Sequence, residues 1–198
     1  MRASFALFAL SSCALGACGA PLAARSTEPS AAELADDANS AAERFLPLRP
    51  DTVFSYSAYR PESTEPELLI LQVERPSPNH ANLRSGGSVK RLELVADGVR
   101  LITGGYLLKL PLTEGADWAG PAGRVRVTGV ERDTNVTAGH FVGCLETTES
   151  DVRGASPRSI VTTYCPGVGI VKFSVDDGDR QERFELKSFG PRVDINRL

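Results

Sequence analysis

Short apolar runs separated by turn residues are the feature that most constrains how this chain can fold. From Phe45 onward, runs rich in Val, Ile, Thr and aromatic residues alternate with clusters of Gly, Pro, Asn and Asp. Turn signals that recur about every 8–12 residues are typical of antiparallel β proteins. The runs predicted to be strands are 52–59, 67–74, 89–96, 99–103, 106–110, 124–130, 139–148, 159–165, 169–175 and 183–189.

This pattern predicts an all-β domain built on a single curved antiparallel sheet. Such a sheet forms an open or partial barrel, and a two-layer sandwich is the alternative. The turns at Asp97-Gly98 and Asp176–Asp179 favour hairpins, because Gly after Asp suits the positive φ angles of a tight turn. We expect the apolar run 67–74 to be a buried strand, Trp118 to anchor an irregular stretch in the core, and 76–87 to be the least ordered connection.

The first residues have the layout of a secretory signal peptide. Arg2 carries the only positive charge before the apolar run Ala3–Leu10, and small residues follow that run. The run is too short to span a bilayer, which needs roughly 20 apolar residues. We therefore expect the chain to be exported from the cytoplasm.

Residues 15–18, Leu-Gly-Ala-Cys, resemble the lipobox of bacterial lipoproteins, in which a branched residue and two small residues precede a cysteine. The resemblance implies a leader of residues 1–17, cleavage after Ala17, and lipid chains such as palmitate on Cys18. Cleavage before the other nearby cysteine, Cys13, would truncate the apolar core and is disfavoured. A soluble exported protein with a chance cysteine is the remaining alternative.

Residues 18–44 are predicted to be the acylated cysteine followed by a flexible tether. The stretch is rich in Ala, Ser and Glu and lacks aromatic residues, so it cannot bury enough surface to offset the entropy lost on ordering. A transient helix from about Ala31 to Arg44 is the alternative. Because Gly19 rather than Asp follows the cysteine, the lipobox resemblance favours the outer membrane in a Gram-negative host. The β domain is then expected to occupy 45–198.

Parts of the β domain resemble a broad group of bacterial envelope lipoproteins. The most specific part is 164–172, which reads Tyr-Cys-Pro-Gly-Val-Gly-Ile-Val-Lys, where the group's pattern usually has Ala at the position of Cys165. Weaker matches are Leu110-Pro111-Leu112 with Gly115 and Trp118, and Gly139–Cys144. The resemblance implies a curved β domain on a lipid anchor, and it implies no activity.

Cys144 and Cys165 lie on two predicted strands that are joined by a polar loop. A hairpin centred between residues 154 and 155 places the two cysteines directly opposite one another. Opposed residues at a non-hydrogen-bonded position have Cα atoms about 4.5 Å apart, a span that a disulfide tolerates. Because export leads to an oxidising compartment, we expect a Cys144–Cys165 disulfide, with two separate buried thiols as the alternative.

No pattern in the sequence indicates a catalytic site, a metal site or a cofactor. His140 and the two cysteines of the domain would supply at most three ligands, without the paired spacing of structural zinc. The Gly-Val-Gly of 167–169 lacks the spacing of a phosphate-binding loop and is expected to be a turn. The acidic residues of 176–179 form too short a run for a calcium loop.

Charge and the predicted anchor together limit the classes of function. A formal net charge of −3 supplies no basic surface for nucleic acid. The leading hypothesis is a non-enzymatic envelope lipoprotein that binds or scaffolds at the membrane surface, with a lipid or another envelope protein as its partner. One alternative is a carrier of lipid or another apolar ligand, in which apolar residues such as Leu68–Leu71 line a cavity on the concave face. The other is an envelope hydrolase with a site that the sequence does not reveal.

Overall fold

The computed structural model describes residues 41–151 and 158–193. The predicted leader, Cys18 and the tether up to residue 40 lie outside the described residues. The strands are β1 (Thr52–Tyr59), β2 (Glu67–Ser77), β3 (His80–Ser85), β4 (Ser88–Val95), β5 (Gly98–Leu101), β6 (Tyr106–Lys109), β7 (Asp117–Ala119), β8 (Arg124–Val136), β9 (Gly139–Asp151), β10 (Arg158–Cys165), β11 (Gly169–Asp176) and β12 (Gln181–Pro191).

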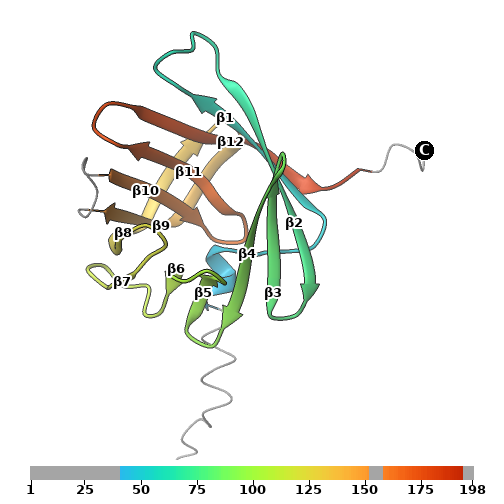
Figure 1. Ribbon diagram of the computed structural model, residues 1–198, viewed down its shortest axis with the longest axis vertical. Helices are drawn as coiled ribbons and strands as arrows, with labels where there is room; N and C mark the ends of the chain where they lie inside the picture. Colours follow the sequence, from blue (N-terminus) through green and yellow to red (C-terminus); the bar gives the residue numbers. More distant parts are fainter. Residues whose placement is uncertain (1–40, 152–157, 194–198) are drawn as a thin grey trace, which may run out of the picture.

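All of these strands belong to one antiparallel sheet (Figure 1). They follow the order β6-β5-β4-β3-β2-β1-β12-β11-β10-β9-β8-β7, so that most neighbours are consecutive in the chain and β1 pairs with β12. The two edge strands, β6 and β7, lie close together. A hydrogen bond links them, in which the Trp118 indole N–H donates to the Tyr106 carbonyl at 3.1 Å. The sheet is therefore a nearly closed barrel, which confirms the predicted single curved antiparallel sheet in its partial-barrel form.

The core lies on the inner face of this sheet and is built from alternate residues of each strand. On β1, Phe54 and Tyr56 are buried while the serines beside them are only partly buried. Trp118 is 5% exposed, which confirms it as a core anchor. The Tyr56 hydroxyl donates to the Ile170 carbonyl at 2.8 Å. Burial raises the pKa of both Tyr56 and Tyr164 above the ordinary value, so these phenols stay neutral inside the barrel.

The segment 76–87, predicted to be the least ordered connection, instead forms the end of β2, the strand β3 and the turns on either side of β3, with one register shift between Glu74 and Ser77. β2 continues to Ser77, and β3 pairs with it after the two-residue turn Pro78-Asn79. Ala81 on β3 is fully buried, and the Ser77 hydroxyl lies 2.9 Å from Nδ1 of His80. The prediction was wrong because Pro, Asn, Arg and Ser are typical of loops, whereas a strand needs apolar residues only at alternate positions.

The sequence predicts that the whole apolar run on β2 is buried, but the structure buries only part of it. Leu69 and Leu71 pack against the core from the inner face. Leu68 and Ile70 point outward and are 60% and 47% exposed. Successive residues of a strand face opposite sides of the sheet, and the described chain has no second layer over this outer face.

Residues 41–51 enter the barrel before β1 begins. They start with a helical turn, 41–45, drawn in blue in Figure 1. Ala42, Leu46 and Leu48 are all buried. The end of the predicted tether is therefore built into the folded domain, because Ala42 is small enough to pack inside it. Within the described residues, no helix has the length and apolar character needed to cross a membrane.

Candidate functional site

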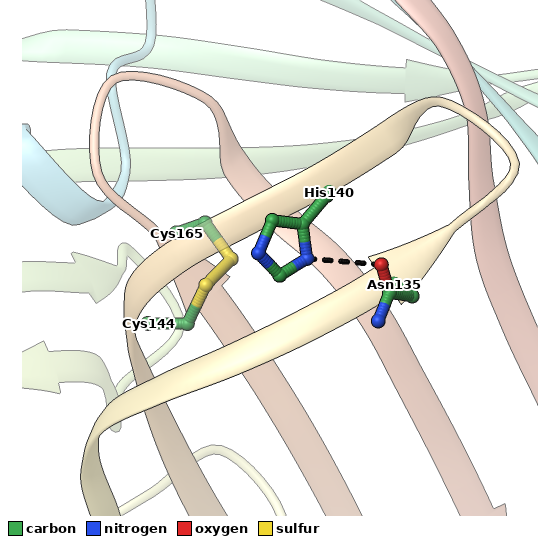
Figure 2. Close-up of a disulfide and its surroundings, with 4 residues drawn as sticks. All are labelled: Asn135, His140, Cys144 and Cys165. Atoms are coloured by element: carbon green, nitrogen blue, oxygen red, sulfur yellow. Dashed lines mark hydrogen bonds between the residues drawn. A yellow bond between two sulfur atoms is a disulfide. The ribbon is translucent and has the colours of Figure 1, made fainter.

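A disulfide between Cys144 and Cys165 ties β9 to the end of β10 (Figure 2). Tyr164, which precedes Cys165, pairs with Leu145, which follows Cys144, and this confirms the predicted register of the hairpin. The two Cα atoms are 4.2 Å apart, and both cysteines are fully buried. While this bond is intact, neither sulfur atom is available as a nucleophile or as a thiolate ligand.

The long hairpin of β8 and β9 bends close to this disulfide. Glu131 and Gly143 both have positive φ angles, 52° and 67°, and the pairing of the two strands shifts in this region. Bulges of this kind bend a hairpin and re-aim its side chains. At the tip of the hairpin, the Ala138 N–H donates to the Leu186 carbonyl of β12 at 2.9 Å. The bent half of the hairpin therefore returns across the sheet to β12.

An open pocket of about 600 Å³ lies beside this bend. Glu131, Asp133 and His140 line it from the bent hairpin, Arg44 from the N-terminal turn, and Cys165 from the end of β10. Within the described residues, Arg44, Glu131 and Asp133 take part in no ion pair. The pocket thus presents both signs of charge to a ligand or partner.

The ionisable side chains of this pocket are exposed to solvent. His140 is held on the hairpin by Asn135, whose amide oxygen lies 2.9 Å from Nδ1 (Figure 2). In the part of the chain that the structure describes, no three His, Cys, Asp or Glu residues are grouped to hold a metal ion. Exposed charges suit binding by ion pairs and hydrogen bonds, whereas catalytic acids and bases are usually tuned by burial and close charges in a cleft.

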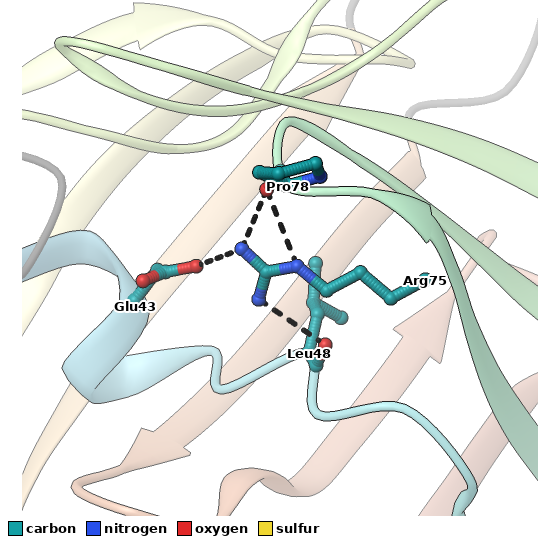
Figure 3. A network of polar contacts seen from close by, with 4 residues as sticks. All are labelled: Glu43, Leu48, Arg75 and Pro78. Atoms are coloured by element: carbon teal, nitrogen blue, oxygen red, sulfur yellow. Dashed lines mark hydrogen bonds and ion pairs between the residues drawn. The ribbon is translucent and has the colours of Figure 1, made fainter.

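Arg75 on β2 fastens the N-terminal segment to the barrel (Figure 3). Its Nη2 lies 2.6 Å from a carboxylate oxygen of Glu43 and donates to the Pro78 carbonyl at 2.6 Å. Its Nη1 donates to the Leu48 carbonyl at 3.4 Å. One guanidinium therefore joins the helical turn, the chain that follows it and the β2–β3 turn.

The β10–β11 turn fastens the same segment from another side. The Gly167 N–H donates to the Arg44 carbonyl at 2.7 Å. Gly167 and Gly169 have φ angles of 75° and 108°, which favour glycine, so the Gly-Val-Gly forms the turn that the sequence predicted. A Cβ added at Gly169 would lie 3.7 Å from the Pro47 ring, which shows how closely the segment passes. Together with Arg75, this turn sets the position of Arg44 at the pocket.

Replacing Arg75 with Met is expected to loosen the N-terminal segment and lower the free energy of unfolding by about 1–2 kcal/mol. The change leaves the Glu43 carboxylate and the Leu48 carbonyl without their charged donor. Amide hydrogen exchange at 42–48 should become faster, and thermal unfolding should report the lost stability. Arg75→Lys keeps the charge but not the planar fork, so it should give an intermediate result. Unchanged exchange in Arg75→Met would contradict this role.

The sequence brought only part of this site into view. It pointed to Cys144 and Cys165, which the structure joins beside the pocket, while Cys18 lies outside the described residues. It did not point to Glu131 and Asp133, because the sequence predicts a strand that ends at residue 130, whereas β8 continues to Val136. The signal that could have extended this strand is the alternation of polar and apolar residues that begins at Arg124, since a strand alternates with a period of two. Arg44, assigned to the tether, carried no such signal.

The acidic residues of 176–179 form the expected hairpin turn. A carboxylate oxygen of Asp176 accepts from the Gly178 N–H at 2.9 Å, and one of Asp177 accepts from the Arg180 N–H at 2.8 Å. These carboxylates stabilise the turn by capping its backbone donors.

No protein-family model matches the sequence, and no curated protein matches it. Among the solved structures that resemble the fold are two bacterial proteins. One is a predicted exported protein of Bacteroides fragilis with a YmcC-like fold, at 10% identity and a TM-score of 0.48, covering 72% of this chain and 96% of that chain. The other is a predicted lipoprotein of Parabacteroides distasonis, at 11% identity and a TM-score of 0.43, with the same two shares. This likeness concerns the arrangement of the strands, and no role follows from it.

Proposed function

We propose that this chain is a lipoprotein of the bacterial envelope whose β domain is a non-enzymatic binding or scaffold module at the membrane surface. The observation that carries the proposal is that residues 41–51 pack into the barrel and form hydrogen bonds with it. Cys18 is joined through residues 19–40 to the segment 41–51, which contacts from Arg75 and Gly167 hold on two sides. A lipid on Cys18 would therefore hold the whole domain, and in a host with two membranes we place it at the outer one.

The nature of the pocket supports binding rather than catalysis. Arg44, Glu131, Asp133 and His140 are exposed at an open surface, and the nearby sulfur atoms are bonded to one another. Such a surface suits a charged partner, because ion pairs and hydrogen bonds form there without burying a lone charge. The partner that we propose for this surface is another envelope protein.

The arrangement of the apolar side chains offers less support to a lipid carrier. Of Leu68–Leu71, which were expected to line a cavity, Leu68 and Ile70 point away from the inner face, whereas Leu69 and Leu71 pack against the core. On that face, Ala42, Leu46 and Leu48 of the N-terminal segment are buried with the core. The domain thus fills part of its concave side with its own chain.

Native mass spectrometry of the full-length protein, extracted from membranes in mild detergent, tests the anchor and separates the module from the carrier. We expect a mature chain that begins at Cys18, with the mass of two or three covalent acyl chains and no further adduct. A chain with another N-terminus and no lipid mass would contradict the anchor. A stoichiometric lipid that is released on denaturation would instead support the carrier.

A further inference from the structure

Within the described chain, part of β2 has no strand paired to it on one side, although β2 lies between β3 and β1 in the sheet. Residues 67–71 pair with β1 on one side, from Ala58↔Glu67 to Phe54↔Leu71. On the other side, β3 begins to pair only at Gln72↔Arg84, and the described chain has no other strand beside β2. The backbone groups of this stretch that point away from β1 are therefore left to solvent or to another molecule.

This edge lacks most of the features that protect exposed edges. Natural sheets usually place Lys, Pro or a bulge on an open edge to prevent pairing with another chain. Between Glu67 and Gln72 the sequence is Leu-Leu-Ile-Leu, and pairing with β1 is regular. The outward Leu68 and Ile70 are the exposed part of this run. We name residues 67–71 the β2 edge.

We propose that the β2 edge pairs with the β2 edge of a second copy of this chain. Antiparallel pairing about a twofold axis at Leu69 places Leu68 of each copy opposite Ile70 of the other. Residues directly opposite one another point to the same face, so the four exposed side chains would form one apolar cluster on the joined outer face. A twofold interface requires such a self-complementary patch.

The charges that flank the edge favour a second copy over any other occupant. Before the edge lies an acidic loop that carries Glu62 and Glu65, and beyond its other end lies the basic β3–β4 hairpin. The exposed bases of that hairpin are Arg84, Lys90 and Arg91. Antiparallel pairing brings the acidic loop of each copy to the basic hairpin of the other, at both ends of the interface.

Most of these flanking charges are available for such contacts. Arg84 forms an ion pair with Glu74 of its own chain. Among the described residues, Glu62, Glu65, Lys90 and Arg91 form no ion pair. In this register Pro66, which has no backbone N–H to donate, falls opposite Gln72, where β3 of the other copy begins to pair through Arg84, so pairing between the copies ends at Glu67↔Leu71.

Cysteine cross-linking in the full-length protein tests this register. A mixture of Leu68→Cys and Ile70→Cys chains should cross-link more than either variant alone, since identical positions would lie on the diagonal, roughly 7–8 Å apart. Ile102→Cys, at another exposed apolar residue, is the control. Cross-linking of the Leu68→Cys and Ile70→Cys mixture that does not exceed that of Ile102→Cys chains would overturn the proposal.

Sedimentation of the detergent-extracted protein provides a second test. Leu68→Lys removes both Leu68–Ile70 contacts and adds a charge to the edge, so it should weaken the dimer about tenfold or more. Because Leu68 is exposed, the variant should unfold at the same temperature as the wild type when both are too dilute to form dimers. Ile102→Lys should leave the association unchanged. A wild type that stays monomeric at every concentration, or a dimer that tolerates Leu68→Lys, would refute β2 pairing.

Discussion

Replacing Cys18 with Ala should reduce palmitate incorporation into this protein to background. Most of the protein should then move out of the detergent phase. Each buried CH₂ contributes about 0.8 kcal/mol to membrane binding, and stable anchoring takes two or more acyl chains. With the thiol removed, the thioether that carries these chains cannot form. The apolar run Ala3–Leu10 is too short to replace them by spanning the bilayer. Metabolic labelling followed by phase partitioning measures both effects.

Cys13 provides the matched control for this experiment. It lies in the predicted leader, so Cys13→Ala should leave the label and the partitioning unchanged. The β domain should fold equally well in both variants, because the buried core that the structure describes begins at Ala42. If Cys18→Ala kept its label while Cys13→Ala lost it, the cleavage site would have to be moved. Label retained in both would remove the anchor and the envelope role that depends on it.

Removing the disulfide with the double variant Cys144→Ala and Cys165→Ala should lower the free energy of unfolding by about 3 kcal/mol. The bond closes a loop with a sequence separation of 21, and its loss gives the unfolded chain more conformational freedom. For a domain of this size, that change corresponds to a Tm lower by roughly 6–12 °C. Alanine keeps both sites apolar, so the loss of the covalent bond dominates over the small change in packing. Thermal and urea unfolding both measure the effect.

A reductant supplies the control for the disulfide experiment. Wild-type protein unfolded in the presence of a strong reductant should approach the Tm of the double variant, while the variant itself should not respond. Hydrogen exchange should accelerate first around Gly143 and the tip at Ala138, because the bent hairpin loses its covalent attachment to β10. A double variant as stable as the oxidised wild type would show that the bond makes no net contribution.

Local patterns predicted much of the fold. Thr52–Tyr59 was predicted with the bounds that the structure has, and the cysteine pairing followed from the centre of one hairpin. Both depend on short-range rules, since a strand alternates with period two and a hairpin fixes its own register. The Asp97-Gly98 turn was placed one residue late, because Ala96-Asp97 forms the turn and Gly98 already pairs with Val95. An added Cβ at Gly98 would lie 2.1 Å from the Leu108 carbonyl oxygen, so close strand packing also calls for this glycine.

The candidate site was less visible, because it is assembled from distant parts of the chain. Arg44, Glu131 and Cys165 meet at one pocket only because the N-terminal segment enters the barrel and the β8–β9 hairpin bends back over it. The register of β8 and β9 shifts at three places along this bend, and composition alone does not show where such shifts lie. The residues that line the pocket therefore had no common signal along the sequence.

Taken alone, the amino-acid order determined the all-β class, the main hairpins and the partner of each domain cysteine, since these depend on neighbours in the chain. Tertiary structure alone decided that β1 meets β12, that residues 41–51 enter the barrel, and that β3 stops short of the β2 edge. The physical reason is that closing a sheet sets how far each strand extends beyond the next. That offset depends on all the strands together, and it decides which apolar residues are covered and which remain open.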